Sequence, residues 1–125
     1  MYKKLIGNTE GLQTSRNALQ MISRDIRHII SPDSIFQASE DSIRFDDVDD
    51  FMISYKFSNS QILRNGDPLL TSVEDVQFNY FDNSGSPLSS PVTNPSEIST
   101  ITISLTTSLN EQSFNLSTKV QPRNF

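Results

Sequence analysis

The chain has 125 residues, of which 34% are hydrophobic, and it contains no cysteine. This length suits one domain with a modest core, and the lack of cysteine excludes a disulfide framework and cysteine-based metal or redox chemistry. The net charge of −5 is unevenly distributed. Residues 1–30 carry five basic and two acidic side chains, a net +3, so the remaining residues sum to −8. Because an acidic body repels phosphates over most of its surface, we expect no nucleic-acid partner.

Residues 9–30 have the periodicity of one long amphipathic helix. On a helical wheel the apolar side chains of this region fall within an arc of about 120°. They are Leu5, Leu12, Leu19, Ile22, Ile26, Ile29 and Ile30. The dipeptide Ser31-Pro32 predicts the end of the helix, because proline disfavours helical geometry at the residue before it. We expect the apolar face to pack on a sheet.

Most of the remaining chain is predicted to form β-strands, because apolar and polar residues alternate between turn residues. The expected strands are 34–37, 42–45, 51–57, 61–64, 73–81, 101–106 and 114–120. Residues 82–97, which contain Gly85 and several prolines, are expected to form a surface loop. This order of elements predicts an α+β fold, with one long N-terminal amphipathic helix packed on one or more antiparallel sheets.

Four segments occur in an order and spacing that resemble a known family: LQMISRDIR at 19–27, ISYKF with ILR within 53–64, LLTSVEDVQFNYFD with Gly85 within 69–85, and VQPRN at 120–124. Together they resemble the minor pseudopilins of type II secretion, most closely the J class, and the related minor type IV pilins. The resemblance implies a single pilin-like domain over residues 1–125. Residues 1–31 would be the helix, truncated before its transmembrane half, and residues 32–125 the β-rich head.

The resemblance implies a function in filament assembly for protein transport or pilus formation. The chain would be a structural minor subunit that acts in the initiation or at the tip of a type II secretion or type IV pilus-like filament. Its partners would be other minor pilins or pseudopilins, through helix bundling, and the inner membrane, through a prepilin-like N-terminal segment missing from this sequence. We would then expect it in the bacterial cell envelope, as a membrane-anchored periplasmic domain or at an extracellular filament tip.

One acidic cluster has the composition of a metal site. Asp46, Asp47, Asp49 and Asp50 lie within five residues and offer oxygen ligands suited to Ca²⁺. Their spacing does not match an EF-hand loop, which needs a glycine and a distant glutamate. The alternative is a solvated acidic turn between two strands, and we expect no other cofactor.

Polar side chains form a second stripe on the predicted helix, beside the apolar one. It consists of Arg16, Gln20, Arg24 and Arg27. One interpretation is a face that only contacts solvent. The other is a partner interface that meets the acidic part of a neighbouring subunit, since the two halves of the chain have opposite charges.

We expect no enzymatic activity. The single histidine, His28, is predicted on the polar side of the helix, and no Ser/His/Asp set, HExxH motif, P-loop or glycine-rich dinucleotide motif occurs. The alternative to the filament subunit is an extracellular β-rich binding module. Such a module would recognise a ligand, a secreted substrate or Ca²⁺ through loops 46–50 and 82–97.

Overall fold

The computed structural model describes the backbone of residues 2–109 and 112–121, and the side chains of residues 13–108, 113 and 115–121. Within these ranges the chain forms one α-helix, α1 (Tyr2–Arg27), two short 3-10 helices, η1 (Pro32–Ser34) and η2 (Pro95–Glu97), and eight strands. The strands are β1 (Ile35–Ala38), β2 (Ser42–Asp46), β3 (Met52–Ser58), β4 (Gln61–Arg64), β5 (Asp67–Leu70), β6 (Val73–Phe81), β7 (Thr100–Leu109) and β8 (Gln112–Val120).

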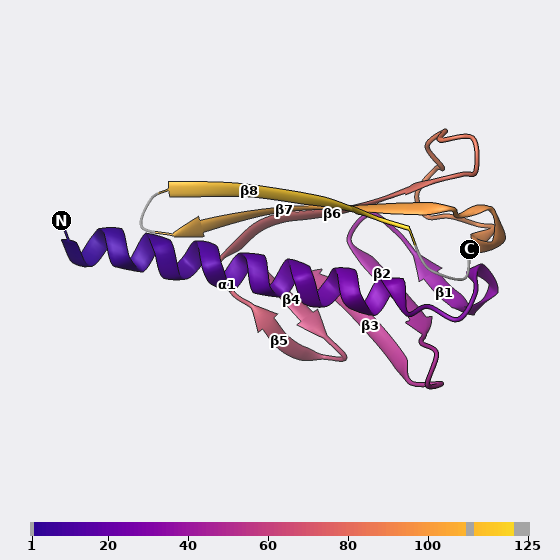
Figure 1. Ribbon diagram of the computed structural model, residues 1–125, viewed down its shortest axis with the longest axis horizontal. Coiled ribbons are helices and arrows are strands. Elements are labelled where there is room, and N and C mark those ends of the chain that lie inside the picture. The colour runs from indigo at the N-terminus through magenta and orange to yellow at the C-terminus, as the bar shows by residue number, and fades with distance from the viewer. Residues whose placement is uncertain (1, 110–111, 122–125) are drawn as a thin grey trace.

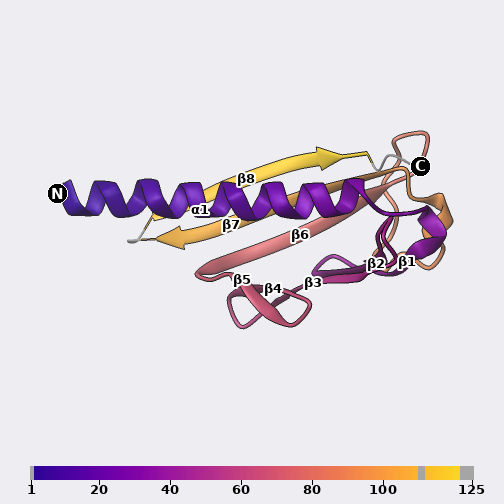
Figure 2. The same cartoon turned by 60° about the horizontal axis from the view of Figure 1, so that its bottom comes forward.

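The strands form two antiparallel sheets. One has five strands in the order β1-β2-β3-β4-β5, and the other has three in the order β6-β7-β8. Helix α1 runs along the three-stranded sheet and contacts β8, β7 and, at its other side, β5. In both ribbon views β8 lies on one side of α1, while β3, β4 and β5 lie on the other (Figures 1 and 2). The helix therefore bridges the two sheets.

The apolar stripe of α1 faces the core as its periodicity predicts. Leu19, Ile22 and Ile26 are buried, and so is Ile29 just after the helix, whereas Ile30 is half-buried. The side chains of Leu5 and Leu12, which belong to the same predicted stripe, lie outside the described residues. The helix ends at Arg27, and its last turn contains Arg24 and Arg27. Positive charge at this end of a helix interacts favourably with the helix dipole.

One hydrophobic core is shared by α1 and both sheets. Its largest fully buried side chains are Phe45 and Tyr55 from the five-stranded sheet and Phe78 and Tyr80 from β6. The sheets are also joined by backbone hydrogen bonds, such as that from the Phe78 N–H to the Glu40 carbonyl at 2.8 Å. Each Å² of apolar surface buried from water contributes about 25 cal/mol to the stability of the folded state. The shared core is therefore the main contribution to folding.

Most strand predictions are confirmed. Residues 61–64 and 73–81 form β4 and β6 with the expected bounds, and the other expected strands overlap β1, β2, β3, β7 and β8. Strand β5 is missed, because the turn signal Asn65-Gly66-Asp67-Pro68 extends into its first two residues. Phe51, expected on the buried face of β3, precedes that strand and is 68% exposed.

The predicted α+β, pilin-like fold class is wrong. The eight strands hold 52 residues against 26 in α1, so the protein is mostly β, and its strands form two sheets. Side chains are described for about 15 of the 26 residues of α1, from Gln13 to Arg27. Where its side chains are described, α1 is amphipathic and is not the long N-terminal apolar helix of a pilin, so the resemblance to the minor pseudopilins and type IV pilins is contradicted.

The membrane-anchoring part of that interpretation is also corrected. Within the described part of the chain, no helix combines the length and the apolar character that crossing a bilayer requires. Pilin-like membrane anchoring therefore has no support from the structure.

Candidate functional site: a groove between α1 and β8

A groove of about 580 Å³ lies between α1 and the edge strand β8. The helix wall carries Arg16, Gln20, Arg24 and Arg27, so the structure brings the predicted polar stripe together along one side of the groove. These positions recur at three- and four-residue spacing, which places them on one helix face. From Arg16 to Arg27 the stripe is roughly 16 Å long, at 1.5 Å per residue.

The opposite wall comes from the middle of β8, through Leu116, Ser117 and Thr118. With Leu19 of the helix, Leu116 gives the groove an apolar component beside its positive charges. Sequence reasoning missed this wall, because the period-two pattern assigns β8 to a sheet but does not say which strand lies beside the helix. The signal available was only the position of β8 as the last strand, a common place for a sheet edge.

The groove is positively charged. Arg16, Arg24 and Arg27 are exposed, and among the side chains described, Arg24 is the one of the three with an ion pair, 4.0 Å from Asp25. This ion pair neutralises little of the positive charge of the groove. The other carboxylate oxygen of Asp25, Oδ2, points away from the groove and bonds to residues of the five-stranded sheet. The arrangement suits an acidic group of a binding partner.

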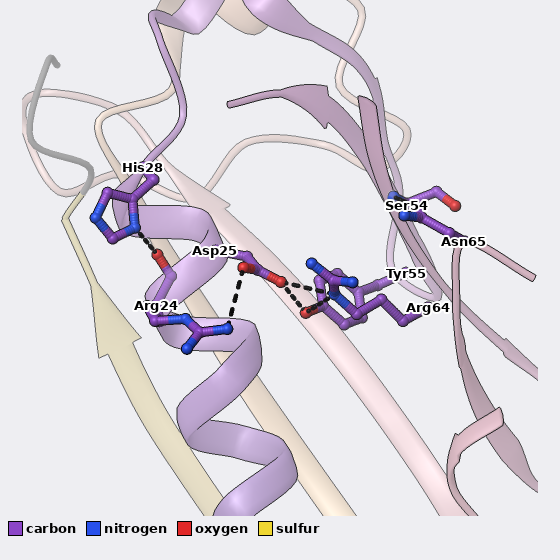
Figure 3. Close-up of polar contacts among 7 residues, drawn as sticks. All are labelled: Arg24, Asp25, His28, Ser54, Tyr55, Arg64 and Asn65. Atoms are coloured by element: carbon purple, nitrogen blue, oxygen red, sulfur yellow. Dashed lines mark hydrogen bonds and ion pairs between the residues drawn. The ribbon is translucent and has the colours of Figure 1, made fainter. Parts of the chain in front are cut away.

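Asp25 connects α1 to the five-stranded sheet (Figure 3). Its Oδ2 atom accepts a short hydrogen bond from the Tyr55 hydroxyl of β3 and another from Arg64 Nε of β4, at 3.0 Å. The Asp25 side chain is 8% exposed, so its negative charge is buried next to a positive one. This pairing fixes the rotation of α1, and therefore which helix face lines the groove.

The polar link shifts the pKa values of its members. Burial, together with the hydrogen bond to the Asp25 carboxylate, raises the pKa of Tyr55 far above its usual value. The hydrogen bond to Asp25 also raises the pKa of Arg64. Tyr55 and Arg64 are protonated at neutral pH even at their ordinary pKa values, and the shifts keep the link protonated at higher pH as well.

The residues proposed for Ca²⁺ lie at the turn between β2 and β3. The carboxylate Oδ1 of Asp47 accepts hydrogen bonds from the backbone N–H groups of Asp49 at 2.9 Å and Phe51 at 3.0 Å, so it closes the turn. Within the described residues, no three histidine or acidic side chains are grouped so that they could hold a metal ion. Asp46, Asp49 and Asp50 therefore gain no support as calcium ligands, and calcium binding here stays a prediction.

The 82–97 segment, also proposed for ligand recognition, is tied to the body of the protein. Asp82 Oδ1 accepts from the N–H groups of Ser84 and Ser86, both at 2.9 Å. Farther along, the N–H of Val92 donates to the Ala38 carbonyl at 2.8 Å. The segment thus has a defined path, and no observation assigns it a ligand.

His28 follows the last residue of α1, and its side chain bonds to the backbone of the last helical turn. Its Nδ1 lies 2.7 Å from the Arg24 carbonyl oxygen, which can only accept, so Nδ1 carries the proton. This bond satisfies one of the carbonyl groups left free at a helix C-terminus.

No protein-family model matches the sequence, and a search of curated proteins gives no significant match. The case for a function therefore depends on the groove itself.

Proposed function

We propose that the protein is a non-enzymatic interaction subunit that binds an acidic segment of a partner protein in the α1–β8 groove. The observation that carries this proposal is the alignment of Arg16, Arg24 and Arg27 along one wall of a groove whose other wall is an edge strand. The proposal combines the subunit role expected from the sequence with the alternative of a binding module. The binding surface is now the helix and not the loops 46–50 and 82–97.

The chemistry of the groove favours a protein partner. Arginine forms bidentate hydrogen bonds with carboxylates, and its guanidinium is weakly hydrated, which makes it frequent at protein interfaces. Leu116 is half-buried and contributes apolar surface that a purely ionic ligand would not use, while Leu19, which also lines the groove, belongs mainly to the core. The acidic remainder of the chain, at −8, disfavours a polyphosphate such as nucleic acid.

The edge strand adds a second mode of contact. Strand β8 pairs with β7 on one side, and its other side is a sheet edge among the described strands. Backbone groups at such an edge are available to an extended or hairpin segment from another chain. Side-chain charge on α1 and backbone groups on β8 would then hold the same partner segment.

Site-specific photo-crosslinking tests this function. A photoreactive residue replaces Gln20, an exposed groove residue, in cells of the organism that makes the protein. We expect defined protein adducts that decrease at least about tenfold when Arg16→Glu and Arg27→Glu are added, because two attractive contacts become repulsive.

The control places the same photoreactive residue at Lys56, which is exposed on β3 and does not line the groove. Lys56 should give none of the adducts seen at position 20. If position 20 forms no protein adduct, or if its adducts persist in the charge-reversed protein, the proposed function is wrong.

A further inference from the structure

The turn between β2 and β3, residues 46–52, exposes an unusual combination of side chains. It carries four aspartates within five residues. Between and after them, Val48 is 49% exposed, Phe51 68% and Met52 52%. These are three of the four large hydrophobic side chains that are exposed in the described part of the chain. Exposed apolar groups gathered at one tip are typical of an interaction surface.

We propose that the groove between α1 and β8 binds the β2–β3 turn of a second copy of this chain. This inference rests on the proposed function, because it identifies the acidic partner segment. The turn offers negative charge together with apolar side chains, and the groove offers three arginines together with Leu19 and Leu116. The two surfaces are thus complementary in charge and in apolar character.

The turn is presented as a rigid element. The N–H of Val48 donates to the His28 carbonyl at 2.8 Å, and Asp47 pairs with Ile29 in an antiparallel bridge. The Asp47 carboxylate holds the tip closed through two backbone hydrogen bonds. A preorganised segment loses little conformational entropy on binding, which favours association.

A single copy cannot place its own turn in its own groove. The turn is fixed by backbone bonds beside the C-terminal end of α1. It leads into β3, which lies on the other side of the helix from β8 in both ribbon views (Figures 1 and 2). The contact must therefore form between copies.

Such a contact joins two different surfaces, so it is heterologous. After one turn fills one groove, the pair still has a free groove at one end and a free turn at the other. A heterologous contact that does not close into a ring continues as an open chain of subunits. The structure thus predicts head-to-tail association that depends on charge and is weakened by salt.

Complementary variants test this geometry. The groove variant carries Arg16→Glu and Arg27→Glu, which leaves the Arg24–Asp25 pair in place. The turn variant carries Asp49→Lys and Phe51→Ser, two exposed positions outside the core. A control variant, Lys56→Glu with Lys119→Glu, has the same change in net charge as the groove variant, at exposed residues that line neither surface. Circular dichroism checks that every variant is folded.

Sedimentation at low salt measures the association. We expect the wild type and the control variant to form oligomers that grow with concentration, whereas each single variant stays monomeric. A mixture of the two variants should form 1:1 dimers and stop, because the groove variant supplies an intact turn and the turn variant an intact groove. Raising the salt from about 20 mM to about 300 mM should weaken the wild-type contact at least about tenfold.

The inference is overturned if the wild type is monomeric at about 0.5 mM and low salt, if either variant still associates, or if the mixture forms no dimer. These results are distinguishable from failure of the proposed function. A monomeric wild type whose position 20 still crosslinks to another protein rejects self-association and retains the groove as a binding site. A monomeric wild type without such adducts rejects both.

Discussion

Replacing Asp25 with alanine should destabilise the fold strongly, because this carboxylate connects α1 to the five-stranded sheet. In the variant the Tyr55 hydroxyl, in a fully buried side chain, loses its acceptor. Arg64 loses the charged acceptor of its Nε group but keeps the Tyr55 hydroxyl oxygen at 3.2 Å, and its side chain, 32% exposed, regains some solvation.

The magnitude follows from these two contacts. A buried hydroxyl that loses its acceptor costs about 1 to 3 kcal/mol, and a hydrogen bond to a charged group contributes about 1.5 to 3 kcal/mol. The Tyr55 oxygen still accepts from Arg64 Nε at 3.2 Å, which reduces the first value. The partial exposure of Arg64 reduces the second value, and removal of the buried Asp25 charge offsets part of the total. We expect a net loss of about 3 kcal/mol for Asp25→Ala.

Urea unfolding followed by circular dichroism measures the change. Tyr55→Phe should cost about 1.5 kcal/mol, because Asp25 keeps its contact with Arg64. The double variant should cost less than the sum of the two, with a coupling of about 1 kcal/mol. The matched control is Arg24→Ala, whose side chain is 61% exposed and whose loss should cost less than about 0.5 kcal/mol. If Asp25→Ala costs no more than this control, the polar link does not hold the helix.

Three further predictions test the same structure. Burial raises the pKa of Tyr55 and Tyr80 above the ordinary 10.0, so both stay protonated in the folded state while the unfolded chain loses these protons. The free energy of unfolding should then fall as pH rises through about 10, by about 1.4 kcal/mol per tyrosine between about pH 9 and pH 11. Tyr80→Phe should remove the share of this pH dependence that Tyr80 contributes. An identical slope in the variant and the wild type would contradict this. The Ile22 side chain is 0% exposed, so Ile22→Ala should lower the free energy of unfolding by about 3 kcal/mol and the melting temperature by roughly 10 °C. A loss below about 1 kcal/mol would mean that the helix is not packed as described. Asp47→Ala should lower the free energy of unfolding in urea by about 1 kcal/mol, because the turn loses two hydrogen bonds. Asp47→Asn keeps an acceptor oxygen and should cost less. Equal losses in the two variants would show that these bonds do not hold the turn.

Local patterns predicted the strands well, because period-two alternation reports which face of a strand is buried. Ile101, Ile103 and Leu105 alternate in the sequence and are all fully buried in β7. The same patterns could not divide the strands between two sheets, since that division depends on pairing between distant residues. The number of sheets therefore stays open in the sequence. The four short segments that resemble the pseudopilins are degenerate patterns, and the mostly β structure does not support the family likeness that they suggest.

The candidate site was predicted in part. Helical spacing predicts that Arg16, Gln20, Arg24 and Arg27 share one face, and in the structure they line one wall of the groove, while their role as a partner interface stays a prediction. The role of Asp25 was missed, because in the sequence it is one acidic residue among basic ones. Its partners Tyr55 and Arg64 lie 30 and 39 residues away, and a contact over that separation leaves no periodic signal.

The most specific property proposed for the α1–β8 groove is that it binds the β2–β3 turn of a second copy of the chain. Nuclear magnetic resonance tests it most directly, with the isotope-labelled turn variant, whose groove is intact, titrated with the unlabelled groove variant, whose turn is intact. We expect saturable chemical-shift changes confined to the backbone amides of α1 from Arg16 to Arg27 and of β8 from Leu116 to Thr118. Shift changes elsewhere on the surface, or none at concentrations of about 0.5 mM, would contradict binding of the turn in the groove.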